Sequence, residues 1–304
     1  MKILVTGGAG FIGGHLVERL LQQNHEIFVV DNESATSSDK FNWFETSKNY
    51  KFSILDTEKM EGIFKQNIDY VFHLAAETKI QLAVEEPEKC FNSNINGTVN
   101  ILELAKKYNV KRVLVASSSS VYGMNEIPNH EAQQPDCLNP YAASKLCDEI
   151  ICNTYYKIYG LESICFRFFN VYGERMPSRG SYAPVIAVFD RQKKNKENMT
   201  ITGDGQQKRD FVYVHDVIDA MIAGMSTTNV KAIGQSYNVG SGVNISINNI
   251  AKIMTGEYNY IPERKGDAKE TLADLNKIEK DLNWKPKVNL KEWLQNFCEN
   301  KYDY

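Results

Sequence analysis

The stretch VTGGAGFIGGHL, residues 5–16, constrains the fold of this chain more than any other segment. It follows an apolar run of strand length and leads into a segment with helical periodicity. Gly8, Gly10 and Gly13 satisfy the pattern G-x-G-x-x-G, and Gly7, Gly10 and Gly13 satisfy the wider G-x-x-G-x-x-G. Such glycines permit a tight strand-to-helix turn, in which backbone N–H groups and a helix N-terminus approach a pyrophosphate. The turn is therefore predicted to bind a dinucleotide.

A carboxylate stands where a dinucleotide-binding fold needs one. Asp31 ends the second apolar run, EIFVVD, 18 residues after Gly13. At that place it can accept hydrogen bonds from a ribose 2′-OH, and it would repel a 2′-phosphate. No basic residue flanks it in VVDNES. The sequence therefore favours NAD over NADP, the alternative being that Asp31 is only a turn residue.

Apolar runs of strand length alternate with segments of helical periodicity along the first half of the chain. The strand-like runs are KILVT, EIFVVD, YKFSIL, YVFHLA, RVLVAS and SICFRFF. Continuous apolar strands between amphipathic helices predict a parallel sheet that is covered on both faces. We expect an α/β protein with a doubly wound parallel Rossmann sheet over residues 1–172, rejoined by part of 209–240. A smaller C-terminal α/β substrate domain is expected over 173–304.

Composition and charge exclude several classes of protein. The 304 residues carry a net charge of −3, which gives no electrostatic case for binding nucleic acid or an anionic membrane. The six cysteines form no CxxC pair and no metal-like cluster with histidine, which is typical of reduced thiols in a cytosolic protein without a metal site. No apolar stretch approaches the roughly 18 residues of a membrane span, and the N-terminus does not read as a signal peptide. We expect a soluble, cytoplasmic protein.

The segment NPYAASKLCDEII opens a predicted helix that contains a candidate base. Pro140 suits the helix start, and Tyr141 and Lys145 are four residues apart, so they share one helical face. An ammonium beside a phenol favours the phenolate and lowers its pKa from about 10 toward neutrality. Tyr141 would then be a usable base at cellular pH. Such a pair alone is commonly a surface accident, but here it follows a dinucleotide-binding fold.

Four elements together resemble an extended short-chain dehydrogenase/reductase: the motif TGGAGFIG, the serine run of LVASSSSVYG, the pair Tyr141 and Lys145, and the segment RFFNVYG. Within that family the chain is most similar, nearly end to end, to NAD-dependent nucleotide-sugar epimerases of the UDP-hexose 4-epimerase type. The resemblance implies NAD as a bound prosthetic group, a UDP-sugar substrate and a homodimer. It also implies that Tyr141 removes the O4′ proton while C4′ passes hydride to NAD⁺, after which the 4-keto sugar turns over and is reduced on its other face.

The same resemblance assigns site residues position by position. Ser118, three positions before the V-Y-G element, would bond the sugar hydroxyl beside Tyr141, and Lys145 would also hold the nicotinamide ribose. The cofactor is expected to contact Gly7, Gly10, Phe11, Ile12, Gly13, Asp31, Asn32, Asp56, Leu74, Ala75, Ala76 and Asn94, besides Tyr141 and Lys145. The nucleotide sugar is expected to contact Asn170, Ser181, Tyr182, Thr200, Thr202, Arg209, Arg264 and Thr271, besides Ser118. Two arginines suit a diphosphate, because guanidinium groups meet phosphate oxygens bidentately.

Related activities leave alternatives. The 4,6-dehydratases and UDP-glucuronate decarboxylases of this family carry carboxylic acids just after the catalytic hydroxyl, where this chain has Ser119 and Ser120. Thr271, at the position that sets pocket size in the family, is small, so UDP-GlcNAc/UDP-GalNAc fits at least as well as UDP-glucose/UDP-galactose. UDP-glucuronate 4-epimerisation stays open, although the family's Gly-Arg-Pro-Asp-Met stretch is missing. A net oxidoreductase of keto-sugars and a non-catalytic NAD-binding protein are the remaining alternatives.

Overall fold

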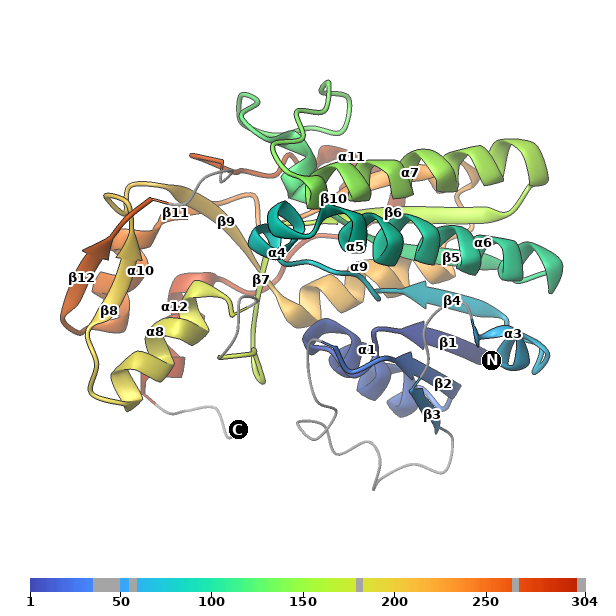
Figure 1. Ribbon diagram of the computed structural model, residues 1–304, viewed down its shortest axis with the longest axis horizontal. Helices are drawn as coiled ribbons and strands as arrows, with labels where there is room; N and C mark the ends of the chain where they lie inside the picture. The colour runs from blue at the N-terminus through green and yellow to red at the C-terminus, as the bar shows by residue number, and fades with distance from the viewer. Residues whose placement is uncertain (35–49, 55–58, 179–182, 264–267, 300–304) are drawn as a thin grey trace.

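Seven parallel strands form the central sheet of the larger part of the molecule (Figure 1). The computed structural model describes residues 1–34, 50–54, 59–178, 183–263 and 268–299. In sheet order the strands are β10 (Gln235–Val239), β6 (Glu162–Phe168), β5 (Arg112–Ser118), β4 (Tyr70–His73), β1 (Lys2–Thr6), β2 (Glu26–Asp31) and β3 (Tyr50–Ile54). The chain winds outward from β1 to β3 and then resumes on the other side of β1 with β4. The predicted doubly wound α/β class is confirmed, and the switch between β1 and β4 is where such sheets bind ligands.

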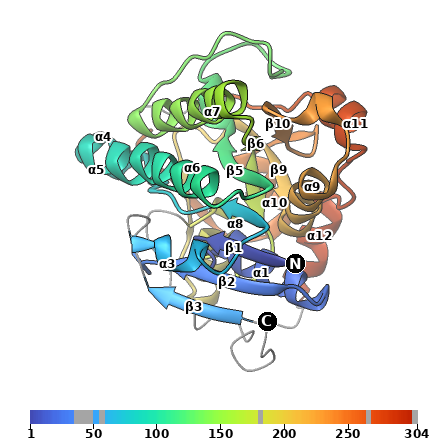
Figure 2. The same cartoon turned by 90° about the vertical axis from the view of Figure 1, so that its right-hand side faces the viewer.

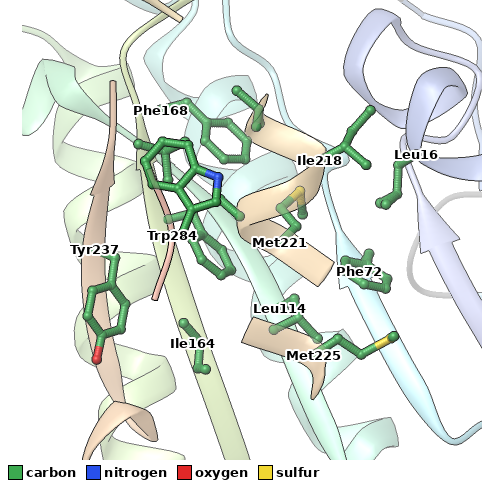
Figure 3. Packing of buried hydrophobic residues seen from close by; sticks show 14 of the residues in the cluster. Leu16, Phe72, Leu114, Ile164, Phe168, Ile218, Met221, Met225, Tyr237 and Trp284 are labelled. Atoms are coloured by element: carbon green, nitrogen blue, oxygen red, sulfur yellow. The ribbon is translucent and has the colours of Figure 1, made fainter. Parts of the chain in front are cut away.

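Helices cover both faces of this sheet (Figure 2). One face carries α1 (Phe11–Gln22), α9 (Val214–Ser226) and α11 (Asn276–Leu282), and the other carries α3 (Glu61–Phe64), α4 (Ile80–Glu85), α5 (Pro87–Phe91), the π-helical turn η3 (Asn92–Asn96), α6 (Gly97–Lys107) and α7 (Pro140–Tyr159). Each face has its own apolar cluster. Figure 3 shows the first, in which Ile218, Met221 and Met225 of α9 pack near Leu114 and Trp284. The sheet is thus buried on both sides, as its continuous apolar strands require.

Helix α7 has sequence signals at both of its ends. The side chain of Asn139 accepts a hydrogen bond from the N–H of Ala142 at 2.9 Å, and Pro140 occupies the first turn. Gly160 ends the helix in the left-handed region, with φ 70°. These caps set where the helix that carries Tyr141 and Lys145 begins and ends.

The smaller part of the molecule lies beyond the carboxyl edge of the sheet (Figure 1). Its elements are β7 (Asn170–Tyr172), α8 (Val185–Lys194), β8 (Met199–Thr202), β9 (Lys208–Tyr213), β11 (Asn244–Ser246), α10 (Ile247–Met254), β12 (Tyr258–Ile261) and α12 (Leu290–Cys298). They form a three-stranded sheet, β11-β9-β7, a parallel pair, β12-β8, and a third apolar cluster. The short 3-10 turns η4 (Ser119–Tyr122) and η5 (Val230–Ala232) complete the described elements.

The chain crosses between the two parts more than once. After β9, helix α9 packs on the large sheet, and β10 pairs with β6 in parallel, with Tyr237 opposite Phe166. After β10 the chain returns to the smaller part of the molecule at β11. Among the described helices, none is long and apolar enough to cross a membrane.

Candidate active site

A cleft of about 1650 Å³ lies at the carboxyl ends of β1, β4, β5 and β6 and extends to the smaller part of the molecule. It brings together residues that the sequence assigned to the site: Gly7, Gly10, Phe11, Ile12, Gly13, Asp31, Asn32, Leu74, Ala75, Ala76, Ser118, Tyr141, Lys145, Asn170, Thr200, Thr202 and Arg209. These members of the predicted dinucleotide set and of the predicted sugar-nucleotide set therefore face one cavity. Four other assigned residues lie outside the described part of the chain: Asp56, Ser181, Tyr182 and Arg264.

The glycine turn is shaped by close backbone approaches. Gly7 has φ 69°, its N–H donates to the Val30 carbonyl at 2.8 Å, and a Cβ on it would lie 2.7 Å from the backbone nitrogen of Ala75. A Cβ on Gly13 would overlap the Gly7 carbonyl oxygen. Helix α1 begins directly after Gly10 without a side-chain cap, so its first N–H groups remain open at the cleft. A side chain at Gly7 or Gly13 would fill the space that the turn encloses. That space suits a pyrophosphate, so the turn fits NAD.

Asp31 ends β2 at the edge of the same cleft. One carboxylate oxygen accepts the N–H of Ala9 at 3.0 Å, and the other accepts the N–H of Glu33 at 2.8 Å. Burial raises the pKa of Asp31, and these backbone hydrogen bonds oppose the rise. The carboxylate is thus held in place beside the glycine turn, where it can accept bonds from ribose hydroxyls.

Tyr141 and Lys145 reach the cleft from the first turns of α7. Lys145 is almost fully buried and its ammonium donates to Asp148 at 3.1 Å. Burial raises the pKa of Tyr141, whereas Lys145 and the hydrogen bond with Ser118 lower it. The net pKa of Tyr141 therefore lies above its ordinary value, opposite to the lowering predicted from Lys145. The reason is that desolvation of the phenolate outweighs the nearby ammonium.

The serine run separates into members with different partners. Ser118 ends β5 at the cleft, and its hydroxyl oxygen accepts from the N–H and the hydroxyl of Ser120, at 3.2 and 2.9 Å. Ser117 also borders the cleft, but its hydroxyl donates to the Glu149 carboxylate at 2.5 Å. Glu149 is also paired with the guanidinium of Arg167 at 2.7 Å, and both side chains are 6% exposed. One serine therefore faces the candidate chemistry and its neighbour belongs to a buried ion pair.

Asn94, assigned to the cofactor, is fully buried behind the cleft and does not line its described wall. Its side-chain oxygen accepts the N–H of Glu77 at 2.7 Å, and its amide donates to the Glu77 carbonyl at 3.0 Å and to Ser144 at 2.8 Å. The Ser144 hydroxyl in turn donates to the Tyr141 carbonyl at 2.8 Å. Asn94 therefore ties the cleft wall at Glu77 to the helix that carries Tyr141.

Thr271, assigned to the sugar pocket, is also absent from the described lining. It is 8% exposed, its N–H donates to the Lys208 carbonyl at 3.1 Å, and its hydroxyl accepts the N–H of Asp210 at 3.3 Å. Arg209, between those two residues, lines the cleft and donates to the carbonyls of Lys208 and Lys269, at 3.0 and 3.2 Å. An effect of residue 271 on the sugar would have to pass through the strand that carries Arg209.

Three buried side chains at the site, Thr6, His73 and Thr98, were given no role by the sequence. Thr6 Oγ1 lies 2.7 Å from His73 Nδ1, His73 Nε2 lies 3.1 Å from Thr98 Oγ1, and the Thr6 hydroxyl accepts the Ala75 N–H at 3.3 Å. Burial lowers the pKa of His73 to about 3, so the ring is neutral. Thr6 and His73 are register partners at the ends of β1 and β4. Their contact could be predicted from the sequence only by pairing those two strands in the correct register. Further lining residues without a prediction are Thr78, Lys79 and Gln207.

Comparisons with known proteins agree with this arrangement. Residues 4–297 match the family described as GDP-mannose 4,6 dehydratase. A putative UDP-glucose 4-epimerase of Methanocaldococcus jannaschii is 36% identical over 302 residues, which cover 96% of each chain. The solved UDP-glucose 4-epimerase of Thermotoga maritima, with UDP-glucose, is similar with a TM-score of 0.91, 35% identity and 98% of both chains covered. The UDP-glucuronic acid 4-epimerase of Bacillus cereus, in complex with UDP-glucuronic acid and NAD, gives a TM-score of 0.89 at 30% identity, over 99% of this chain and 100% of that one.

Proposed function

This chain belongs to the family described as GDP-mannose 4,6 dehydratase, within the extended short-chain dehydrogenase/reductases, and on that premise we propose that it is an NAD-dependent 4-epimerase of UDP-hexoses. One observation carries the proposal: Ser118, Tyr141 and Lys145 face the same cleft as the glycine turn that fits a dinucleotide. NAD, when bound, accepts hydride from C4′ of the sugar and returns it.

The residues of this chain divide the remaining work. Tyr141 takes the O4′ proton and later returns it, and the Ser118 hydroxyl orients the same oxygen. Lys145 supplies the positive charge that favours the phenolate, and it holds the nicotinamide ribose. A bound nicotinamide cation would add to that charge and offset the burial that raises the pKa of Tyr141.

The nucleotide sugar is proposed to lie across the smaller part of the molecule, with the large sheet, which α9 and β10 rejoin, as the NAD domain. Asn170 and Arg209 border the cleft there and suit a diphosphate, with Thr200 and Thr202 farther along. The candidate substrates are UDP-GlcNAc/UDP-GalNAc and UDP-glucose/UDP-galactose, with UDP-glucuronate as the alternative. Hydroxyls at Ser119 and Ser120 favour epimerisation over dehydration or decarboxylation, which need a carboxylic acid nearby.

The test is interconversion without added cofactor. Purified protein with its bound NAD is given each UDP-sugar separately, and the ratio of the two C4 epimers is followed by anion-exchange chromatography. We expect one or more pairs to reach the same ratio from either side, with no accumulation of NADH at 340 nm. Tyr141→Phe is the control, since it should keep NAD and lose turnover. Failure to interconvert any pair would overturn the proposal, and stoichiometric NADH would indicate a net oxidoreductase.

We further propose that the enzyme is a cytoplasmic homodimer. The helices expected from the family to form the dimer interface are residues 92–107 and 141–159, which are η3 with α6, and α7. Helix α7 packs against both η3 and α6, and its Ile150 and Ile158 are 58% and 66% exposed. A second copy of this pair would cover them, as expected from the family. All six cysteines are free, as in a reducing compartment. A light-scattering mass equal to one chain would contradict the dimer.

A further inference from the structure

A third ionisable residue shares the catalytic face of α7. Asp148 follows Lys145 by three residues and Tyr141 by seven, so the three side chains lie along one side of the helix. Its carboxylate accepts the Lys145 ammonium at 3.1 Å. Asp148 is 0% exposed and the Lys145 side chain is 3% exposed, so water does not screen this pair. The positive charge next to the candidate base therefore has a fixed negative partner.

Among the described residues, Lys145 is the cation that pairs with Asp148. The titratable or charged groups that face the two are Tyr141, Cys147 and Glu149 on α7, His73 on β4, Cys90 on α5 and Cys165 on β6. His73 is neutral, and the cysteines have raised pKa values and stay as thiols. Glu149 is bound to Arg167. Burial raises the pKa of Asp148, and Lys145 and the Thr98 hydroxyl oppose that rise.

We propose that Asp148 is a positioning residue for the catalytic pair: its ionised carboxylate holds the Lys145 ammonium and offsets part of the positive charge that Tyr141 experiences. The proposal rests on the proposed function in taking Tyr141 as the base. Without the carboxylate, the lysine charge would act on the phenol uncompensated. The first proton lost from the Tyr141–Lys145 pair would then leave at lower pH. Because the two groups are coupled, this pKa belongs to the pair and not to either residue.

The experiment measures ionisation of Tyr141 directly in the NAD-loaded protein. Phenolate absorbance at 295 nm is followed against pH in the wild type and in Asp148→Asn, and the matching proteins that also carry Tyr141→Phe are subtracted to remove the other tyrosines. We expect Asp148→Asn to lower the midpoint by about one pH unit, roughly a tenfold change in the proton-dissociation constant. The acidic limb of kcat/KM should move in the same direction. The absorbance titration needs no sugar, so a failed epimerase assay would leave it standing.

Controls separate this role from a structural one. Asp148→Ser, which removes the same charge with a smaller side chain, should move the midpoint the same way and serves if the asparagine variant does not fold. Asp190→Asn removes a carboxylate from a partly exposed helical pair with Lys194, 2.9 Å apart, and should leave the midpoint unchanged. A lower melting temperature with an unmoved midpoint, or a midpoint that rises, would overturn the proposal.

Discussion

Adjacent serines at the end of β5 should respond to alanine substitution in opposite ways. Ser117→Ala removes a hydroxyl that donates to the buried Glu149 carboxylate at 2.5 Å. A hydrogen bond to a charged group contributes about 1.5–3 kcal/mol. Glu149 keeps its bonds from Arg167 and Ser236, so the lower end of that range applies. Ser118→Ala removes the hydroxyl that bonds Tyr141 at the cleft, and leaves that ion pair intact.

We therefore expect Ser117→Ala to lower the free energy of unfolding by about 1.5–2 kcal/mol, or the melting temperature by roughly 3–8 °C, with kcat nearly unchanged. Ser118→Ala should keep its melting temperature and lose about 100-fold or more in kcat. Both are measured with bound NAD saturated, by thermal unfolding and by the epimer-ratio assay on the same preparations. If Ser118→Ala kept its turnover, or if Ser117→Ala lost kcat with unaltered stability, the assignment of different roles to the two serines would be wrong.

Three further outcomes are expected. Gly13→Ala should abolish retention of NAD, because its Cβ would overlap the Gly7 carbonyl, whereas Gly62→Ala, which meets nothing within 4 Å, should retain it; equal NAD content by absorbance would contradict the cradle. Burial holds the pKa of His73 at about 3 against 6.5 when unfolded, so the unfolded chain binds an extra proton between these values and stability falls as the pH drops through them. In urea titrations from pH 7 to 4, His73→Gln should show a shallower loss than the wild type; parallel curves would argue against it. Thr271→Tyr should lower stability and activity on N-acetylated and plain UDP-hexoses alike, because the site is buried behind Arg209; loss confined to the N-acetylated pair would instead support a gate at residue 271.

Local rules account for much of the large sheet and for the residues that face the cleft. Period and order of the apolar runs predicted the parallel sheet, since such strands are buried on both faces. The glycine spacing fixes the turn after β1, and the caps of α7 are readable as Asn-Pro at its start and Gly160 at its end. Residues that end neighbouring parallel strands meet at one edge, so the sequence alone predicts that motifs far apart along the chain lie together.

Other features depend on burial and on contacts between distant segments, which no local pattern contains. The pKa of Tyr141 is one such feature. The spacing predicted that Lys145 lies beside the phenol, but only the folded site shows that desolvation of the phenolate outweighs the lysine charge. Asn94 and Thr271 are others, because whether a side chain reaches the cleft or fastens its wall depends on what packs in front of it.

The sequence by itself determined a Rossmann-type sheet, a dinucleotide turn and a Tyr141–Lys145 pair on one helical face, since these follow from periodicity and short-range sterics. Only the tertiary structure decided that Ser117 and Ser118 serve different neighbours and that Lys145 is paired with Asp148 out of water. The physical reason is that an electrostatic interaction depends on distance and solvent exposure, and both are set by segments that come together when the chain folds.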